Sequence, residues 1–386
     1  MNRSEAYIVD AVRTPVGKRG GGLSAVHPAD MGAHVISALL SRTGVNPELI
    51  DDVIFGCVDT VGGQAGDIAR TAWLAAGFPE SVPGVTIDRQ CGSSQQAVQF
   101  ATHAVASGMQ DLVVVGGVQS MSMIPINSSF IAGRDLGFED PFRGSTGWTE
   151  RYGDQQITQF RAADMIADRW DLTRKEMEAL ALESHRRALD AQSAGRFQAE
   201  ISPLNGLSQD EGPRTPDPEK MASLPPIIAG GRTTAAMSSQ LSDAASAALI
   251  ASESAVKRFN LTPRARVHFA SCKGDSPVIM LTAPIPATRH ALDRTGLSLD
   301  DIDLVEINEA FASVVLAWQR ELKADLSKVN VNGGAMALGH PIGATGTRLL
   351  TTLIHELERS KGRWGLQVMC EGGGQANVTI VENLAQ

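Results

Sequence analysis

The sequence predicts an α/β fold made of two similar halves with mixed sheets, joined by an inserted loop segment. Strand-like and helix-like segments alternate in the first third of the 386 residues, and the same alternation returns in the last third. Between about residues 119 and 240 the alternation stops. The chain is long enough for two or three units with large hydrophobic cores.

In the first third, short apolar runs alternate with segments whose apolar residues recur at helical spacing. Several of the helical segments end at Gly or Asn, as helices commonly do. Few polar residues flank these elements, so we expect them to be buried on more than one side. Strands are expected at residues 7–9, 52–58, 85–88 and 112–115, and helices at 30–41, 68–76 and 93–107.

The last third repeats this scheme. In both thirds a strand leads through a short turn into a helix and then into another strand, and the turn contains Cys91 in the first copy and His340 in the second. One internal duplication therefore places Cys91 and His340 at equivalent corners. Strands are expected at residues 266–270, 304–307, 329–331 and 366–369, and helices at 286–295, 310–324 and 345–359.

The middle segment is organised differently. Thr173 and Glu176 form a capping-box pattern before a helix with one apolar face, and Gly195 is placed to end it. Five prolines then crowd residues 213–226, which predicts an extended covering loop without regular structure. We therefore expect an N-terminal half at residues 1–120 with part of 240–265, an inserted loop domain at 121–239 and a C-terminal half at 266–386.

Composition excludes several classes of function. The 34 Lys and Arg against 43 Asp and Glu give a net charge of -9, which leaves no broad basic face for nucleic acid. The beginning of the chain has no signal-peptide pattern, and no apolar run approaches the ~20 residues of a membrane span. We expect a soluble cytoplasmic protein.

The four cysteines are widely spaced and show no zinc-ligand pattern, so they are expected to be free thiols, and no metal is expected. Cys57 and Cys272 fall in apolar strands and are interpreted as core residues. Cys91 lies in DRQCGSSQQA, at the expected start of a helix. A helix N-terminus stabilises a thiolate, so the sequence predicts a lowered pKa and a nucleophile; a small buried core cysteine is the alternative.

Three further motifs carry candidate chemistry. His340 lies in the glycine-rich stretch NVNGGAMALGHPIGATG, which allows a ligand close to the backbone and holds the ring before Pro341; a structural histidine is the alternative. Cys370 precedes three glycines in MCEGGGQAN, where adjacent N–H groups can bind an oxyanion and the thiol can act as acid and base; otherwise this is a glycine-rich corner. Asn308 and Glu309 in VEINEAFAS can orient a water and brace a neighbour, or form a helix cap.

Together with the opening YIVDAVRTPVGK, these motifs occur in the order and at the spacing of the thiolase superfamily, which the whole chain resembles. The resemblance implies a five-layer αβαβα fold of two duplicated halves with an inserted, CoA-binding loop domain. It also implies that Cys91 is the acyl-carrying nucleophile, that His340 activates it, and that Cys370 moves the proton on the α-carbon of the other thioester. Neither step needs a metal.

The same resemblance implies two oxyanion holes. Asn308 would hold a water that forms one hole with His340, and the N–H groups of Cys91 and Gly372 would form the other. CoA is expected as a co-substrate rather than a permanently bound cofactor. By resemblance Ser239 lies beside the pantetheine and Arg214 near the nucleotide; a solvated loop charge is the alternative for Arg214.

The chain departs from the common family pattern at residues 242–245 and 152–155 and at Glu371, and in these features it is most similar to bacterial degradative thiolases, including those of steroid-ring catabolism. The expected reaction cleaves a 3-oxoacyl-CoA with CoA to acetyl-CoA or propionyl-CoA and a shortened acyl-CoA, in fatty-acid or steroid-ring β-oxidation. The alternatives are a biosynthetic acetoacetyl-CoA thiolase, a β-ketoacyl synthase and a non-catalytic acyl-CoA or lipid carrier. A homodimer or homotetramer is expected.

Overall fold

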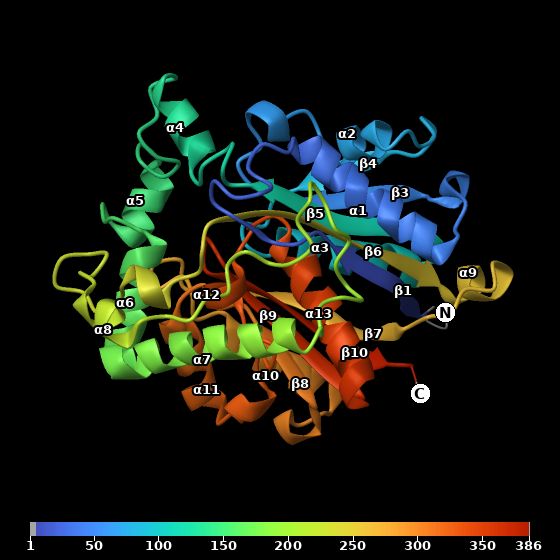
Figure 1. The fold of residues 1–386 in the computed structure, drawn as a ribbon. Coiled ribbons are helices and arrows are strands. Elements are labelled where there is room, and N and C mark those ends of the chain that lie inside the picture. Colours follow the sequence, from blue (N-terminus) through green and yellow to red (C-terminus); the bar gives the residue numbers. More distant parts are fainter. Residues whose placement is uncertain (1–4, 386) are drawn as a thin grey trace.

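The computed structural model describes residues 5–385, and its centre is one sheet with the strand order β4-β3-β5-β6-β1-β7-β10-β9-β8, to which the short β2 adds beside β6 (Figure 1). The strands are β1 (Ala6–Arg13), β2 (Gly17–Lys18), β3 (Asp52–Gly56), β4 (Gly84–Ile87), β5 (Leu112–Ser120), β6 (Ser242–Ser252), β7 (Ala265–Gly274), β8 (Leu304–Ile307), β9 (Trp364–Glu371) and β10 (Gln375–Asn383).

Helices cover the sheet and form the segment between the halves. They are α1 (Pro28–Thr43), α2 (Ile68–Ala75), α3 (Ser93–Ala106), α4 (Ser128–Arg134), α5 (Thr146–Tyr152), α6 (Gln159–Arg169), α7 (Arg174–Ser193), α8 (Pro218–Ser223), α9 (Glu253–Arg258), α10 (Pro284–Thr295), α11 (Ala312–Leu322), α12 (Ala335–Leu338) and α13 (Thr345–Ser360). None of the helices within residues 5–385 is long and apolar enough to cross a membrane.

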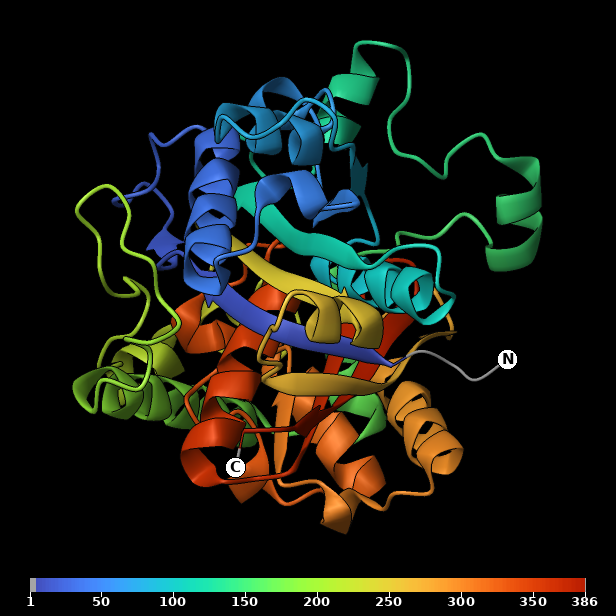
Figure 2. The same cartoon turned by 90° about the vertical axis from the view of Figure 1, so that its right-hand side faces the viewer.

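The two halves have the same strand order, which confirms the predicted duplication. The order β3-β5-β6-β1 of the first half matches β8-β9-β10-β7 of the second. In the place of β4, which pairs parallel with β3, the second half has only the parallel bridge between Val329 and Val305. The halves join where β1 pairs antiparallel with β7, with Tyr7 opposite Arg266. Figure 2, turned by 90°, shows β1 and β7 side by side between the blue and the orange halves.

Three hydrophobic clusters separate the layers. One packs α1 and α2 against the first half-sheet, and another packs α10 and α11 against the second. The third lies between the half-sheets and contains the buried faces of α3 and α13, including Val98 and Leu353. The order is therefore helices, sheet, helices, sheet, helices, and the predicted αβαβα arrangement is confirmed.

Some local predictions differ from the structure. The expected strand at 329–331 is reduced to a single bridge between Val329 and Val305. The proline-rich stretch contains the short helix α8, because Pro218 occupies its first turn, where no N–H is needed, and the Asp217 side chain caps it. The long strands β6 and β10 were not predicted as elements. The three-part division of the chain at residues 120, 240 and 266 stays a prediction.

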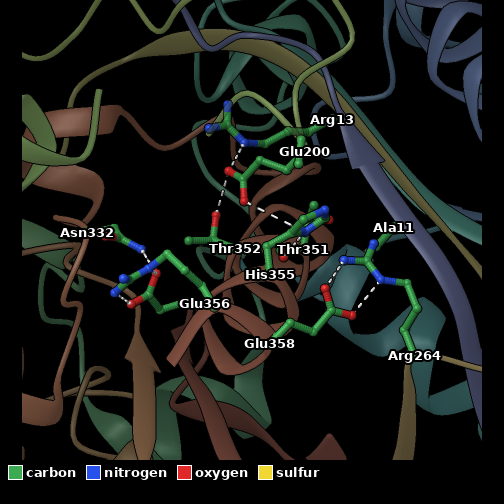
Figure 3. A network of polar contacts seen from close by, with 12 residues as sticks. Ala11, Arg13, Glu200, Arg264, Asn332, Thr351, Thr352, His355, Glu356 and Glu358 are labelled. Atoms are coloured by element: carbon green, nitrogen blue, oxygen red, sulfur yellow. Dashed lines mark hydrogen bonds and ion pairs between the residues drawn. The ribbon is translucent and has the colours of Figure 1, made fainter. Parts of the chain in front are cut away.

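A buried polar network ties the middle segment to both halves (Figure 3). The Arg13 side chain on β1 is fully buried; its Nε donates to Glu200 at 2.7 Å and its guanidinium contacts Asp210 at 2.6 Å. Thr352 on α13 donates to the same Glu200 carboxylate at 3.0 Å. Removing one member of a buried charge pair lowers the free energy of unfolding by about 3–5 kcal/mol. These contacts therefore hold the middle segment against β1 and α13.

Candidate active site

Cys91 lies in the turn between β4 and α3. Gln90 before it has a left-handed backbone with φ of 50°, and the Asp88 carboxylate accepts the Gln90 N–H at 2.7 Å. The helix begins at Ser93 with Gly92 as its N-cap. The turn leaves Cys91 half-buried, in contact with the apolar cluster that contains Ile342 from the His340 loop.

The predicted lowering of the Cys91 pKa is wrong. Burial, followed by the negative charge of Glu371, raises the pKa of the Cys91 thiol to about 12. Hydrogen bonds from the backbone N–H groups of Cys91 and Gly372 act in the opposite direction but are outweighed. The Cys91 thiol therefore stays protonated in the resting protein, and a base must take its proton during attack.

The same two N–H groups are the pair that the sequence assigned to an oxyanion hole. The Cys91 and Gly372 N–H groups both lower the pKa of the Cys91 thiol, although they come from different halves of the molecule. An oxyanion formed on a carbon attached to that sulfur would lie next to both donors.

His340 is buried, and both ring nitrogens have partners. Its Nδ1 lies 2.7 Å from Thr345 Oγ1, and Thr345 donates its hydroxyl hydrogen to the Pro341 carbonyl at 2.9 Å. A hydroxyl has one hydrogen, so His340 Nδ1 must be the donor to Thr345, which leaves Nε2 unprotonated. Burial and then the Arg348 charge lower the pKa of His340 to about 3, so the ring is neutral.

Asn308 follows β8 and lies beside this unprotonated nitrogen, with Nδ2 at 3.4 Å from His340 Nε2. Its Oδ1 is buried and has no hydrogen-bond partner within residues 5–385, as expected for a group that contacts a water or a substrate. Glu309 braces the surrounding loops by accepting hydrogen bonds from Ser184, Asn330 and the Met336 N–H.

Cys370 lies near the end of β9, fully buried in the cluster that contains Phe311 and Met336. Burial raises its pKa well above the ordinary value, and the charges of Cys91 and Glu371 add to the effect. Glu371, which follows Cys370, packs against Gly92, which follows Cys91, so the two thiols lie in the same region. The structure therefore brings Cys91, His340, Asn308 and Cys370 together.

Of the two residues expected to contact CoA, only Ser239 has contacts that place it beside the Asn308 and His340 loops. The Ser239 N–H donates to the Ala310 carbonyl at 3.0 Å, and the next residue, Gln240, accepts the His340 N–H at 2.9 Å. Arg214 lies further out: its N–H donates to His185 at 3.4 Å, and no carboxylate within residues 5–385 forms an ion pair with its guanidinium. A polyphosphate could use that unpaired charge.

The remaining thiols differ from one another. Cys57 is fully buried in the first-half core, as predicted. Cys272 is half-buried on β7 and donates to Gln96 Oε1 at 3.2 Å, so it belongs to a polar network and not to the core. The described residues contain no group of three or more His, Cys, Asp or Glu side chains suited to a metal ion.

Two residues of the site had no role in the sequence analysis. Thr345 holds His340, and its signal was a hydroxyl five residues after the histidine at a helix start. Glu371 was noted only as a departure from the family pattern, but it acts on the pKa of both Cys91 and Cys370. No local pattern could show this effect, because Glu371 and Cys91 come from different halves.

Comparison with known proteins places the chain. Family models for the thiolase N-terminal domain and the thiolase C-terminal domain match residues 6–254 and 261–383. The chain is 60% identical over 385 residues to the steroid 3-ketoacyl-CoA thiolase FadA6 of Mycobacterium tuberculosis, covering 99% of this chain and 95% of that protein. It is 43% identical to the beta-ketoadipyl-CoA thiolase of Pseudomonas aeruginosa, covering 98% and 99% of the two chains.

Among solved structures, the acetyl-CoA acetyltransferase of Bacillus anthracis matches with a TM-score of 0.87 and 36% identity, covering 99% of both chains. The resemblance seen in the motifs is confirmed by these matches along nearly the full length. The protein belongs to the thiolase family and is an acyltransferase.

Proposed function

We propose that this enzyme is a degradative thiolase that cleaves a 3-oxoacyl-CoA with CoA, releasing acetyl-CoA or propionyl-CoA and a shortened acyl-CoA, with steroid-ring fragments as the substrate class. The similarity to a steroid 3-ketoacyl-CoA thiolase supports this choice of substrate. The observation that carries the reaction type is that the loop of the neutral His340 packs on Cys91 through Ile342, while Glu371, next to the second thiol Cys370, packs on Gly92.

In the first half-reaction, His340 Nε2 takes the proton of Cys91 while the sulfur attacks the 3-keto carbon. The bond between C2 and C3 then breaks, and its electron pair passes to C2 to form the enolate of acetyl-CoA or propionyl-CoA. Cys370, whose raised pKa keeps it protonated, gives its proton to C2. The shortened acyl group remains on Cys91 as a thioester.

In the second half-reaction, Cys370 as thiolate takes the proton of the CoA thiol. The CoA sulfur attacks the acyl carbon, and the Cys91 sulfur leaves and recovers the proton held by His340. Both cysteines and the histidine return to their starting protonation states, so the cycle needs no added oxidant or reductant.

Each half-reaction places negative charge on a thioester or keto oxygen. We assign the Cys91 and Gly372 N–H groups to the oxyanion on the carbon attached to Cys91, since both favour negative charge on its sulfur. We assign Asn308, through a water, together with His340 to the enolate oxygen. Removing one such donor typically costs a factor of 10²–10³ in rate.

CoA acts as a co-substrate in this scheme. We place its pantetheine beside Ser239, which lies between the Asn308 and His340 loops, and its nucleotide beside the unpaired guanidinium of Arg214. The expected cytoplasmic location, the homodimer or homotetramer and the inserted CoA-binding domain at 121–239 stay predictions.

Biosynthetic acetoacetyl-CoA thiolase activity is the second candidate, supported by the match to an acetyl-CoA acetyltransferase structure. A β-ketoacyl synthase is disfavoured because that class lacks the second cysteine. A non-catalytic carrier is disfavoured because Cys91, His340 and Cys370 are all present.

Intact-protein mass spectrometry tests the proposal. The wild type and Cys91→Ala are incubated with acetyl-CoA, acetoacetyl-CoA and a panel of larger 3-oxoacyl-CoAs that includes ring-bearing acyl groups. We expect a covalent acyl adduct that is absent in Cys91→Ala and is discharged by CoA, with ring-bearing donors loading best. Best loading from acetoacetyl-CoA supports the biosynthetic alternative, and CoA binding without any adduct supports the carrier.

A further inference from the structure

Glu371 is a fully buried carboxyl group placed against the Cys91 turn. It ends β9, and its Oε1 accepts the Asn377 N–H of β10 at 2.9 Å. A Cβ atom added to Gly92 would lie 1.9 Å from that same Oε1. The carboxyl group therefore packs directly on the backbone of the residue that follows the proposed nucleophile.

Two acceptors beside Gly92 lack a donor. Glu371 Oε2 and Asn377 Oδ1 are both buried without a hydrogen-bond partner within residues 5–385. The orientation of the Asn377 amide is fixed, because its Nδ2 donates to Gln96 Oε1 at 3.0 Å. Asn377 Oδ1 also faces Gly92, at 2.6 Å from an added Cβ. One proton on the Glu371 carboxyl would supply the donor that this pair of oxygens lacks.

The surroundings do not compensate a negative charge at Glu371. The nearest cation is Arg89, which attracts the carboxylate but makes no ion pair with it; its guanidinium instead donates to Gln375 at 2.6 Å. The other titratable groups that interact with Glu371 are the thiols Cys91, Cys370 and Cys272, whose ionisation its charge opposes. Burial raises the pKa of Glu371 to about 8.

We propose that Glu371 is a positioning residue that holds a proton in the resting enzyme, donates it within the pair with Asn377, and reduces the reactivity of Cys91 when it ionises. Neutral Glu371 supports the turn without placing a charge beside the sulfur, and ionised Glu371 opposes thiolate formation. The inference rests on the proposed function only in taking Cys91 as the nucleophile.

The test measures how fast iodoacetamide alkylates Cys91 between pH 6 and 10, by peptide mass spectrometry that resolves Cys91 from the other thiols. Glu371→Gln keeps the shape and a donor but cannot ionise. The matched control, Glu382→Gln, removes a charge at the opposite end of the same β9–β10 pair, where Glu382 faces Trp364. No substrate is needed for this measurement.

We expect the three proteins to react equally below about pH 7. Above pH 9, Glu371→Gln should react about tenfold faster than the wild type and the control, the equivalent of one pKa unit. Coincident profiles for Glu371→Gln and wild type would overturn the inference, as would a uniform loss of reactivity in a folded Glu371→Gln.

The wild type alone provides a second measurement if Glu371→Gln does not fold. Its alkylation rate should rise with pH by less than tenfold per unit above about pH 8, where Glu371 ionises; a slope of tenfold per unit throughout refutes the proposal. Failure of the proposed function is recognised separately: the acyl adduct would then be missing although the alkylation profiles separate.

Discussion

The two equivalent corners of the duplicated fold differ in the length of the connection and in the burial of the candidate catalytic side chain. In the first half, the chain passes from β4 to α3 through residues 88–92, and the thiol of Cys91 is left half-buried. In the second half, the chain takes residues 330–344 to reach α13, includes α12 on the way, and buries His340. The short turn leaves Cys91 partly exposed, whereas the longer loop buries His340 among hydrogen-bond partners.

The corners also support one another. Neither α3 nor α13 has a side-chain cap on its first turn. Instead, Ser94 of α3 accepts the Thr347 N–H of α13 at 3.0 Å, and a Cβ on Gly346 would lie 2.1 Å from the Gln95 nitrogen. The duplication thus brings the two helix starts that follow Cys91 and His340 into contact.

The largest expected effect comes from enlarging the first corner. Gly92→Ala directs a methyl group at the Glu371 carboxyl, which is held in place by Asn377. The turn must move by about 1 Å, and displacements of that size typically lower kcat about 100-fold. Steady-state thiolysis and circular dichroism would measure activity and folding together.

Gly274→Ala is the control for this substitution, because an added Cβ there meets no atom within 4 Å and the φ angle is ordinary. It should keep wild-type kcat. If Gly92→Ala also kept full activity, the close packing of Glu371 against the nucleophile turn would have no catalytic importance.

A smaller effect is expected at the second corner. Thr345→Val keeps the shape of the side chain but removes the partner of His340 Nδ1, so the ring loses its fixed tautomer. We expect kcat to fall about tenfold, which is part of the ~10²–10⁴-fold that general acid–base catalysis contributes, with KM unchanged. Thr345→Ser should restore the rate, since its hydroxyl can occupy the same place.

Thr351→Val provides the comparison within the same helix, because Thr351 donates only to the Thr347 carbonyl one turn earlier. Its kcat should equal that of the wild type. A Thr345→Val enzyme with unchanged kcat and an unchanged pH profile would show that packing alone holds His340.

Much of this arrangement could be predicted from periodicity and motifs. Most strands and helices were expected near their observed positions, but β6 was not, since its run SDAASAALIAS has the composition of a helix. Its strand conformation comes from pairing with β1 and β5 on its two sides. The bridge at Val329 shows the opposite case, where an apolar run makes only one bridge to β8.

The positions of the site residues were more predictable than their protonation. The motifs indicated Cys91, His340 and Cys370, and the fold brings them together. The lowered pKa expected for Cys91 followed from its place at a helix start, but burial and Glu371 determine the outcome. Both influences arise from packing of the second half against the first, and no local pattern contains that information.

The smallest expected effect is on the free energy of unfolding. Its dependence on pH should change in a variant of the second corner, at His340, but not in a variant of the first corner, at Cys91. The folded pKa of His340 is about 3, against 6.5 for the free side chain, so between these values the unfolded chain binds the extra proton. The stability associated with neutral His340 is fully present above pH 6.5 and is lost progressively down to about pH 3. Because His340→Gln cannot take up that proton, its unfolding free energy should fall less than that of the wild type on acidification.

One pH unit below 6.5, the two proteins should differ in this change by about 1 kcal/mol, the linkage expected for one proton. Urea unfolding at pH 7.5 and pH 5.5 measures the difference, and the other buried histidines contribute equally to both proteins. Cys91→Ser, which alters the first corner, should follow the wild type, because a thiol that is protonated in both states binds no additional proton over this range. Equal acid sensitivity of His340→Gln and wild type would mean that folding leaves the His340 pKa at its ordinary value, so that burial does not keep the ring neutral over this pH range.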